Sequence, residues 1–158
     1  MVPILQYKSF WEYLITVVTG IDRVQLAFDL DDFSEIVNDI EVDEVVLLAV
    51  MPSADGEATS HDDYEEIDNV YVYLLKKSNP ADLTHDQIIS EMAALQVIIT
   101  ALKHELISLA GDCEHQCDNP LIGLIKNLMI GTMHTDPEYN LMGCNGYGLY
   151  FKLKTKGV

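Results

Sequence analysis

Apolar residues recur every three or four positions between Thr84 and Gly111, and this is the strongest periodic signal in the chain. This spacing places apolar side chains on one face of a helix. Thr84 and Gln87 fit a capping box at its start, and Gly111 is typical of the residue that ends a helix. The pattern therefore predicts a helix over residues 84–111, about 40 Å long. Its apolar stripe consists of Ile88, Met92, Leu95, Ile99, Leu102, Leu106 and Leu109.

A second row of apolar residues widens this stripe. A two-stranded coiled coil requires a narrower seam that is flanked by charged residues. We therefore expect the helix to lie at the centre of a globular domain and to contact more than one neighbour. A seam for a partner helix is the alternative interpretation. The second row contains Ile89, Ala93, Val97, Ala101 and Ile107.

The rest of the hydrophobic pattern predicts shorter elements. Helices are expected over residues 9–19, 31–40 and 121–127. Strands are expected over residues 44–51, 69–77, 128–135 and 147–154. Residues 23–30 are expected to form a short strand or an extended connection, residues 53–68 an irregular acidic loop, and residues 136–146 a shaped turn.

The order of these elements predicts an α+β fold. We expect an antiparallel sheet of about four strands, with the long helix and the shorter helices packed on one face. The chain has 158 residues, which is the size of one domain with a substantial core. No internal repeat or linker divides it, so residues 1–158 are predicted to form a single domain.

The chain is strongly acidic. Nine Lys and Arg residues against 26 Asp and Glu residues give a formal net charge of −17. Such a surface repels the phosphates of nucleic acids and anionic membranes, so we expect neither direct nucleic-acid binding nor membrane association. Solubility alone is one explanation of this charge. A cationic partner, a metal ion, or a surface that keeps DNA away are the more specific ones.

The sequence also bears on where the protein resides. The N-terminal residues lack the basic start, apolar core and cleavage site of a secretory signal. Three cysteines cannot all pair within one chain, which favours a reducing compartment. The apolar runs at residues 45–52 and 71–75 are too short to span a bilayer. We expect a location in the cytoplasm or in a virion rather than secretion.

Cys113, His115 and Cys117 form the pattern that is most similar to a metal site. Zinc takes thiolate and imidazole ligands in a tetrahedral arrangement, so Cys144 and His134 would have to complete this site across the fold. The chain has no second ligand pair at a fixed distance. Incidental cysteines are therefore the simpler interpretation, and we expect no metal and no cofactor. A small metal-binding domain built on the Cys113–Cys117 cluster is an alternative.

Recognisable catalytic motifs are missing from the chain. It contains no HExxH zinc motif, no glycine loop followed by lysine and no serine elbow, and no paired motif of a thiol nucleophile surrounds any of the three cysteines. Gly143, Gly146 and Gly148 precede a strand rather than open a helix. They therefore predict a turn with positive φ or a bulge, and not a phosphate-binding loop. We expect a protein that is not an enzyme.

The best candidate for an interaction surface is the acidic loop together with the strand that follows it. Loops of this length are commonly functional or disordered. Ordinary sheet packing is the simpler explanation of the two tyrosines in this set. The predicted surface consists of Asp62, Asp63, Glu65, Glu66, Tyr71 and Tyr73.

The layout of residues 10–154 resembles that of certain bacteriophage proteins. The similar features are the small acidic domain, the strand of alternating aromatic residues that leads into Lys76 and Lys77, the long helix, and the segment NLMGCNGYGLYFKL before the end. Small tail-terminator, tail-completion and head–tail connector proteins, some of them encoded by prophages, share this order. The sequence has no feature that fixes the size of a ring.

This resemblance implies a homo-oligomeric ring around the path of the DNA, in contact with other virion proteins. An acidic lumen would keep passing DNA from adhering, because like charges repel. The alternative from another class is an acidic DNA mimic that sequesters a basic partner. That alternative predicts carboxylates spaced along one face like phosphates.

Overall fold

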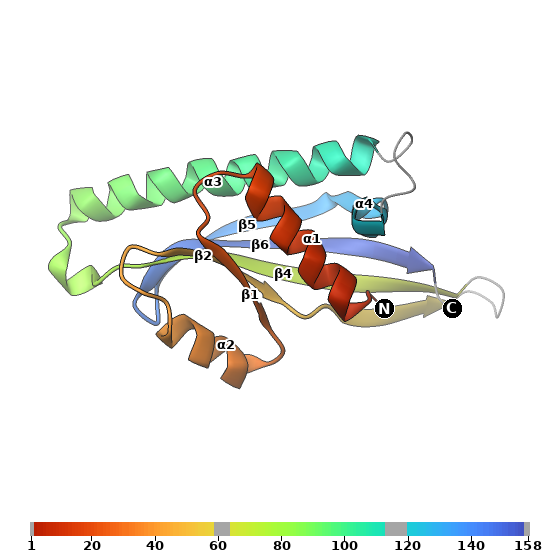
Figure 1. Ribbon diagram of the computed structural model, residues 1–158, viewed down its shortest axis with the longest axis horizontal. Helices are drawn as coiled ribbons and strands as arrows, with labels where there is room; N and C mark the ends of the chain where they lie inside the picture. Colours follow the sequence, from red (N-terminus) through yellow and green to blue (C-terminus); the bar gives the residue numbers. More distant parts are fainter. Residues whose placement is uncertain (1, 59–63, 113–119, 157–158) are drawn as a thin grey trace.

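The computed structural model describes residues 2–58, 64–112 and 120–156 (Figure 1). The fold is α+β, as predicted. The elements are α1 (Ile4–Val17), β1 (Arg23–Ala27), α2 (Leu30–Asn38), β2 (Val45–Val50), β3 (Ser53–Ala58), β4 (Tyr64–Lys77), a 3-10 turn (Pro80–Asp82), α3 (His85–Asp112), α4 (Pro120–Ile125), β5 (Leu128–Leu141) and β6 (Cys144–Lys156).

The strands form one mostly antiparallel sheet with the order β1-β2-β4-β6-β5, and β3 also pairs with β4. The expectation of about four strands was too low, because the sheet has six. The sheet is also not purely antiparallel. β1 and β2 run parallel, with α2 connecting them. A parallel neighbour requires such a crossover, and the helix supplies it.

β2 and β3 lie end to end along the same side of β4. Ala49 pairs with Val72 and Ser53 pairs with Asn69, so residues 50–52 oppose residues 70–71. The β2–β3 side therefore has one residue more than β4 at this point, which is the arrangement of a β-bulge. The bulge lies at Pro52, a residue that cannot donate to the ladder. The prediction of an irregular loop over residues 53–68 was therefore wrong for the described part. The backbone of β4 pairs with the polar segment of β3 even though β3 lacks apolar alternation.

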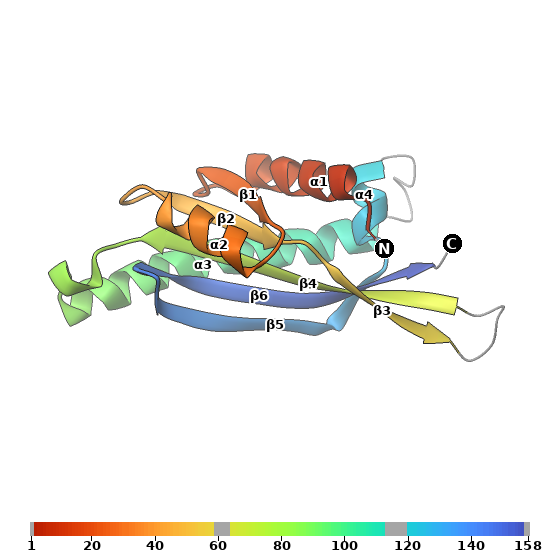
Figure 2. The same ribbon diagram turned by 90° about the horizontal axis from the view of Figure 1, so that it is seen from below.

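Helices α1, α3 and α4 pack on one face of the sheet and enclose the main core (Figure 2). Trp11 of α1 is fully buried and contacts Phe10 and Tyr7 edge to face. The predicted stripe of α3 enters this core through Leu95, Ile99, Leu102, Leu106 and Leu109.

Helix α2 packs on the other face of the sheet, so the prediction that all helices share one face was wrong. β-strand alternation explains the two cores, because successive side chains of β4 point to opposite faces. Leu74 belongs to the main core, whereas Leu75 belongs to a smaller cluster with Val37 and Ile40 from the α2 region.

The predicted start of α3 is confirmed in detail. The Thr84 backbone N–H donates to Gln87 Oε1 at 2.8 Å, and the Gln87 N–H donates to Thr84 Oγ1 at 3.3 Å. This reciprocal pair is the capping box. Helix α1, by contrast, begins at Ile4, after Pro3, and not at the predicted Ser9.

β5 and β6 form a longer hairpin than predicted. Only Met142 and Gly143 separate the strands, with φ values of 53° and 83°. Two successive positive φ values define the tight turn whose twist suits a two-residue hairpin. The predicted positive-φ turn is confirmed at Gly143, but residues 136–141 continue β5 instead of forming part of a wide turn.

Candidate functional site

Tyr71 and Tyr73 lie on the face of the sheet that is opposite α3. Their neighbours Val70 and Val72 are fully buried in the main core, and the alternation of β4 places the tyrosines on the other side. Helix α2 covers only part of this face. Tyr71 is therefore 45% exposed in spite of its position in a central strand.

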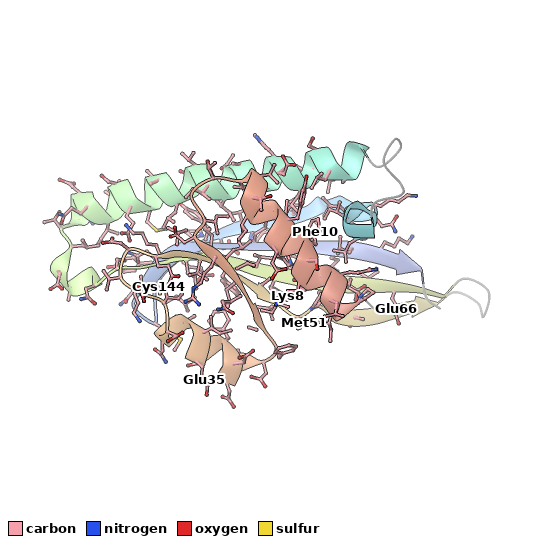
Figure 3. The ribbon with its side chains drawn as sticks, in the orientation of Figure 1. Lys8, Phe10, Glu35, Met51, Glu66 and Cys144 are labelled. Carbon is pink, nitrogen blue, oxygen red and sulfur yellow. The ribbon has the colours of Figure 1, made fainter. Side chains whose placement is uncertain are left out.

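The structure describes only part of the acidic set in the predicted surface. Asp62 and Asp63 lie outside the described residues. The backbone of Glu65 belongs to β4 and pairs with Lys156. Glu66, near the end of the β3–β4 hairpin, shares the face of Val70 and not that of the tyrosines, because it is an even number of residues from Val70 (Figure 3). The structure therefore does not bring Glu66 together with the tyrosines.

A chain of contacts ties the tyrosines to the β3–β4 hairpin. The ring centroids of Tyr71 and Tyr150 lie 4.8 Å apart. The Tyr150 hydroxyl donates to Asn69 Oδ1 at 3.0 Å. The side-chain amide nitrogen of Asn69, Nδ2, donates to Asp55 Oδ2 at 2.8 Å. These contacts connect β6, β4 and β3, so the aromatic residues are held in one orientation on the sheet.

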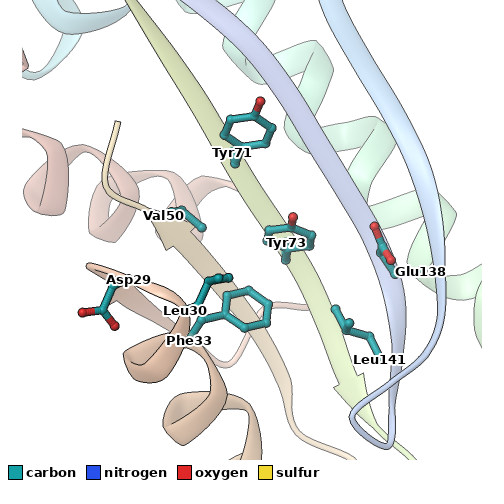
Figure 4. A pocket seen from close by; sticks show the side chains of 8 residues that line it. All are labelled: Asp29, Leu30, Phe33, Val50, Tyr71, Tyr73, Glu138 and Leu141. Atoms are coloured by element: carbon teal, nitrogen blue, oxygen red, sulfur yellow. The ribbon is translucent and has the colours of Figure 1, made fainter. Parts of the chain in front are cut away.

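A groove of about 470 Å³ runs along this face between α2 and β5 (Figure 4). The tyrosines of β4 form its floor. Phe33 of α2 packs edge to face on Tyr73, with ring centroids 5.2 Å apart and an interplanar angle of 77°. The lining is mostly apolar and contains two carboxylates. It consists of Asp29, Leu30, Phe33, Val50, Tyr71, Tyr73, Glu138 and Leu141.

Glu138 places its carboxylate next to Tyr73, and the sequence analysis did not identify it. A Cβ atom on Gly148 would lie 3.3 Å from Glu138 Oε1 and 3.4 Å from Tyr73 Cε1, so this glycine leaves space between the two side chains. Among the described residues, the Glu138 carboxylate has no ion pair or side-chain hydrogen bond. It is a partly buried charge without a counter-ion.

This environment shifts two ionisation equilibria. Burial, and secondarily the charge of Asp136, raises the pKa of Glu138 above 4.5. Burial, followed by the charges of Glu138 and Tyr71, raises the pKa of Tyr73. Both groups are therefore less easily ionised than in water.

The Asp136→Asn substitution should lower the pKa of Glu138 toward its usual value, because it removes the repelling charge. The shift should be partial, since burial is the larger cause. Titration of the Glu138 side-chain carboxyl by carbon NMR measures it. An unchanged Glu138 pKa in this variant would contradict the proximity of the two carboxylates.

In the native protein the raised pKa makes the ionised Glu138 carboxylate oppose folding. The contribution of Glu138 to the free energy of unfolding therefore improves as the pH falls through the folded pKa toward 4.5.

A second uncovered surface lies on α3, on the side that points away from the sheet (Figure 1). Val97 is 70% exposed and Ile89 is 54% exposed, and Ala93 and Ala101 are exposed as well. Within the described residues, most of the predicted second row thus has no neighbour. We call Ile89, Ala93, Val97 and Ala101 the outer row of α3.

The outer row gives α3 an unusual composition for a helix at a protein surface. By length and hydropathy alone, residues 85–111 would suffice to cross a membrane, and 28% of the most apolar window is buried. The opposite stripe of the same helix is packed against the sheet, as in a core helix of a soluble protein. This finding does not show an association with membranes. The exposed apolar side chains do lie along one face of the helix, and contiguous apolar patches on proteins commonly mark interaction sites.

The predicted metal cluster cannot be built from the described residues. Cys113, His115 and Cys117 lie outside them. Cys144 is buried at the α2 end of β6, where burial raises the pKa of its thiol (Figure 3). His134 is exposed on β5, with its Nε2 atom 3.0 Å from Asp136 Oδ1. Within the described ranges, no group of three or more His, Cys, Asp or Glu side chains is placed to hold a metal ion.

No protein family matches this sequence, and no curated protein matches it.

Proposed function

We propose that the protein is a non-enzymatic assembly subunit of the tail-completion or head–tail connector kind, from a phage or prophage. In this proposal, copies of the chain form a homo-oligomeric ring with an acidic surface, which binds other virion proteins and not DNA. The resemblance of the layout to such proteins supports the proposal. The outer row of α3 is the observation that carries it.

The outer row has the properties of a contact between copies. Removing apolar surface from water contributes roughly 25 cal/mol per Å², and Val97 and Ile89 offer such surface at their present exposure. Ala93 and Ala101 are small, so a neighbouring backbone can approach the helix closely. Because α3 has 28 residues, this contact would be long enough to involve several turns of the helix.

The β3–β4 hairpin supports the same proposal. It runs past the ends of α1 and α3 in both views, away from the cores (Figures 1 and 2). A projecting, hydrogen-bonded arm suits contact with an adjacent subunit or a neighbouring ring.

The net charge of −17 would oppose close approach of the copies, and of DNA, because like charges repel.

The solution mass, measured by light scattering at low and high salt, tests the proposal. We expect a discrete oligomer that is favoured at about 1 M salt, where charges are screened within roughly 3 Å while apolar contacts persist. A monomer at every salt and protein concentration would refute self-assembly.

The Val97→Lys variant should be monomeric under the same conditions, because it places a charge in the centre of the outer row. It also lowers the net negative charge, so added repulsion cannot explain a loss of assembly. Gln96→Lys is the matched control, since Gln96 is exposed on the same helix and its side chain points about 100° away. Sedimentation of the three proteins measures the difference. Equal masses for Val97→Lys and the native protein would exclude the outer row as the interface.

A further inference from the structure

The groove between α2 and β5 combines aromatic rings with an uncompensated carboxylate. Phe33, Tyr71 and Tyr73 contribute the rings, and Glu138 contributes the carboxylate. We propose that this groove binds the cationic side chain of a lysine or arginine from a partner protein. The inference rests on the proposed function for the existence of a partner, but the groove is complete within one chain.

Two other partly buried carboxylates have a cationic partner, which Glu138 lacks among the described residues. Glu44 Oε1 accepts from Arg23 Nε at 2.6 Å, and Glu91 Oε2 lies 3.2 Å from Lys76 Nζ. The chain thus places cations beside these carboxylates. The Glu138 carboxylate has no such partner among the described residues. A partly buried charge without a partner is unfavourable, so a cation supplied from outside would be stabilised beside it.

The aromatic residues favour the same kind of ligand. The face of a tyrosine or phenylalanine ring attracts a cation by about 0.5–2 kcal/mol, and the attraction is strongest where water is excluded. Tyr73 lies beside the Glu138 carboxylate across Gly148, so one cation can contact both. The contact of Tyr73 with Phe33 holds the Tyr73 ring in place.

The shape of the groove suits a long side chain with a charged end. Its volume of about 470 Å³ falls within the range of roughly 300–1,000 Å³ that is typical of ligand sites. The aliphatic stem of a lysine or arginine would contact apolar atoms of the lining near Tyr73, while its charged end reaches Glu138. Figure 4 shows Tyr73 between Leu30, Phe33 and Val50 on one side and Glu138 and Leu141 on the other.

Other classes of ligand fit less well. An anion would be repelled by Glu138, by Asp29 at the groove and by Asp136 on the same strand. A purely apolar side chain would cover the carboxylate without neutralising it, which is unfavourable. None of the eight lining residues is basic. The net charge of −17 would in addition attract a basic partner and raise its rate of association.

Titration with short peptides, followed by NMR of the backbone amides, tests the inference. The probes are acetyl-Gly-Gly-Lys-Gly-Gly-amide, its arginine analogue, and the neutral norleucine analogue, which keeps the aliphatic stem. We expect saturable shifts at Tyr71, Tyr73 and Gly148 with at least one cationic peptide and none with the norleucine peptide. Equal binding of the norleucine peptide would overturn the inference.

Two variants locate the site. Glu138→Gln should weaken binding of the cationic peptide by about tenfold, which is the effect of losing one partly desolvated charge pair. Glu35→Gln removes the same charge from an exposed residue of α2 that does not line the groove, and it should change the affinity by less than about threefold. Equal losses in both variants would show that only the overall charge matters and would overturn the inference. Preserved amide spectra confirm that the variants are folded.

The titration also separates this inference from the proposed function. The groove and the outer row of α3 lie on opposite sides of the sheet, so the Val97→Lys variant should bind the cationic peptide as the native protein does. Binding by a chain that never assembles would support the groove and refute the ring. A ring without peptide binding would support the assembly and refute the groove.

Discussion

Replacing Gly146 with alanine is expected to lower the free energy of unfolding by more than about 4 kcal/mol or to prevent folding, which places it among the exceptional substitutions. A Cβ atom at this position would lie 1.9 Å from the Leu74 carbonyl oxygen, 2.9 Å from the Leu74 carbonyl carbon and 3.1 Å from Leu75 Cα. These are backbone atoms of a central strand. They cannot move aside without breaking the pairing of β4 with β6 or with β2.

Urea unfolding followed by circular dichroism measures this effect. Gly123→Ala is the matched control, because Gly123 lies in α4 and a Cβ atom there would meet no described residue outside its own helix within 4 Å. In a helix, alanine is favoured over glycine by up to about 1 kcal/mol, so the control should be neutral or stabilising. If Gly146→Ala unfolded at the same urea concentration as the native chain, the register of β4 and β6 would have to be different.

Leu102→Ala is expected to cost about 2–5 kcal/mol of stability, whereas Val97→Ala should cost less than about 0.5 kcal/mol. Leu102 is fully buried in the main core, and truncating it leaves a cavity against the sheet. Val97 is 70% exposed on the same helix. The two substitutions therefore compare the two sides of α3, and neither lowers the helix propensity, because alanine is the best helix former.

Thermal unfolding at a protein concentration where the chain is monomeric measures both variants. At roughly 2–4 °C per kcal/mol for a domain of this size, Leu102→Ala should lower Tm by about 10 °C. Similar losses in the two variants would mean that the outer row of α3 is covered within the monomer. The proposed interface would then lose its basis.

The elements that could be predicted were those with a strong local signal. α3 has a regular apolar stripe and a capping box, and β2 is a continuous apolar run, so both were predicted correctly. β3 has no apolar alternation in its sequence SADGEA, and only its pairing with β4 makes it a strand. Local propensity does not predict this pairing, so it does not predict the strand.

The parallel pair β1 and β2 could have been predicted more fully. The sequence shows a short extended segment, a helix and an apolar strand in succession, and this order is typical of a parallel pair with a crossover helix. The connection also determines that α2 packs near β1 and β2. Since α1 and α3 already cover one face, α2 lies on the other, where it forms a wall of the groove.

The candidate site was only partly predictable. Tyr71 and Tyr73 stand out as an alternating aromatic pair, and the structure places both in the groove. Glu138 lies in a segment with Pro, Asn and Gly that is typical of a turn, and only the two-residue hairpin at Met142 and Gly143 extends β5 this far. Glu138 can therefore be recognised as a groove residue only once its pairing with Gly146 in the β5–β6 ladder is known.

β4 has a mechanical consequence for the projecting hairpin. It continues without interruption from Tyr64 to Lys77, pairs with β3 and then β2 on one side, and pairs with β6 along the other. A pull on the hairpin along its axis would load these ladders in shear, so many hydrogen bonds would have to break together rather than one after another. β4 would therefore act as a stiff rod that transmits tension from Tyr64 to Lys77, toward the start of α3.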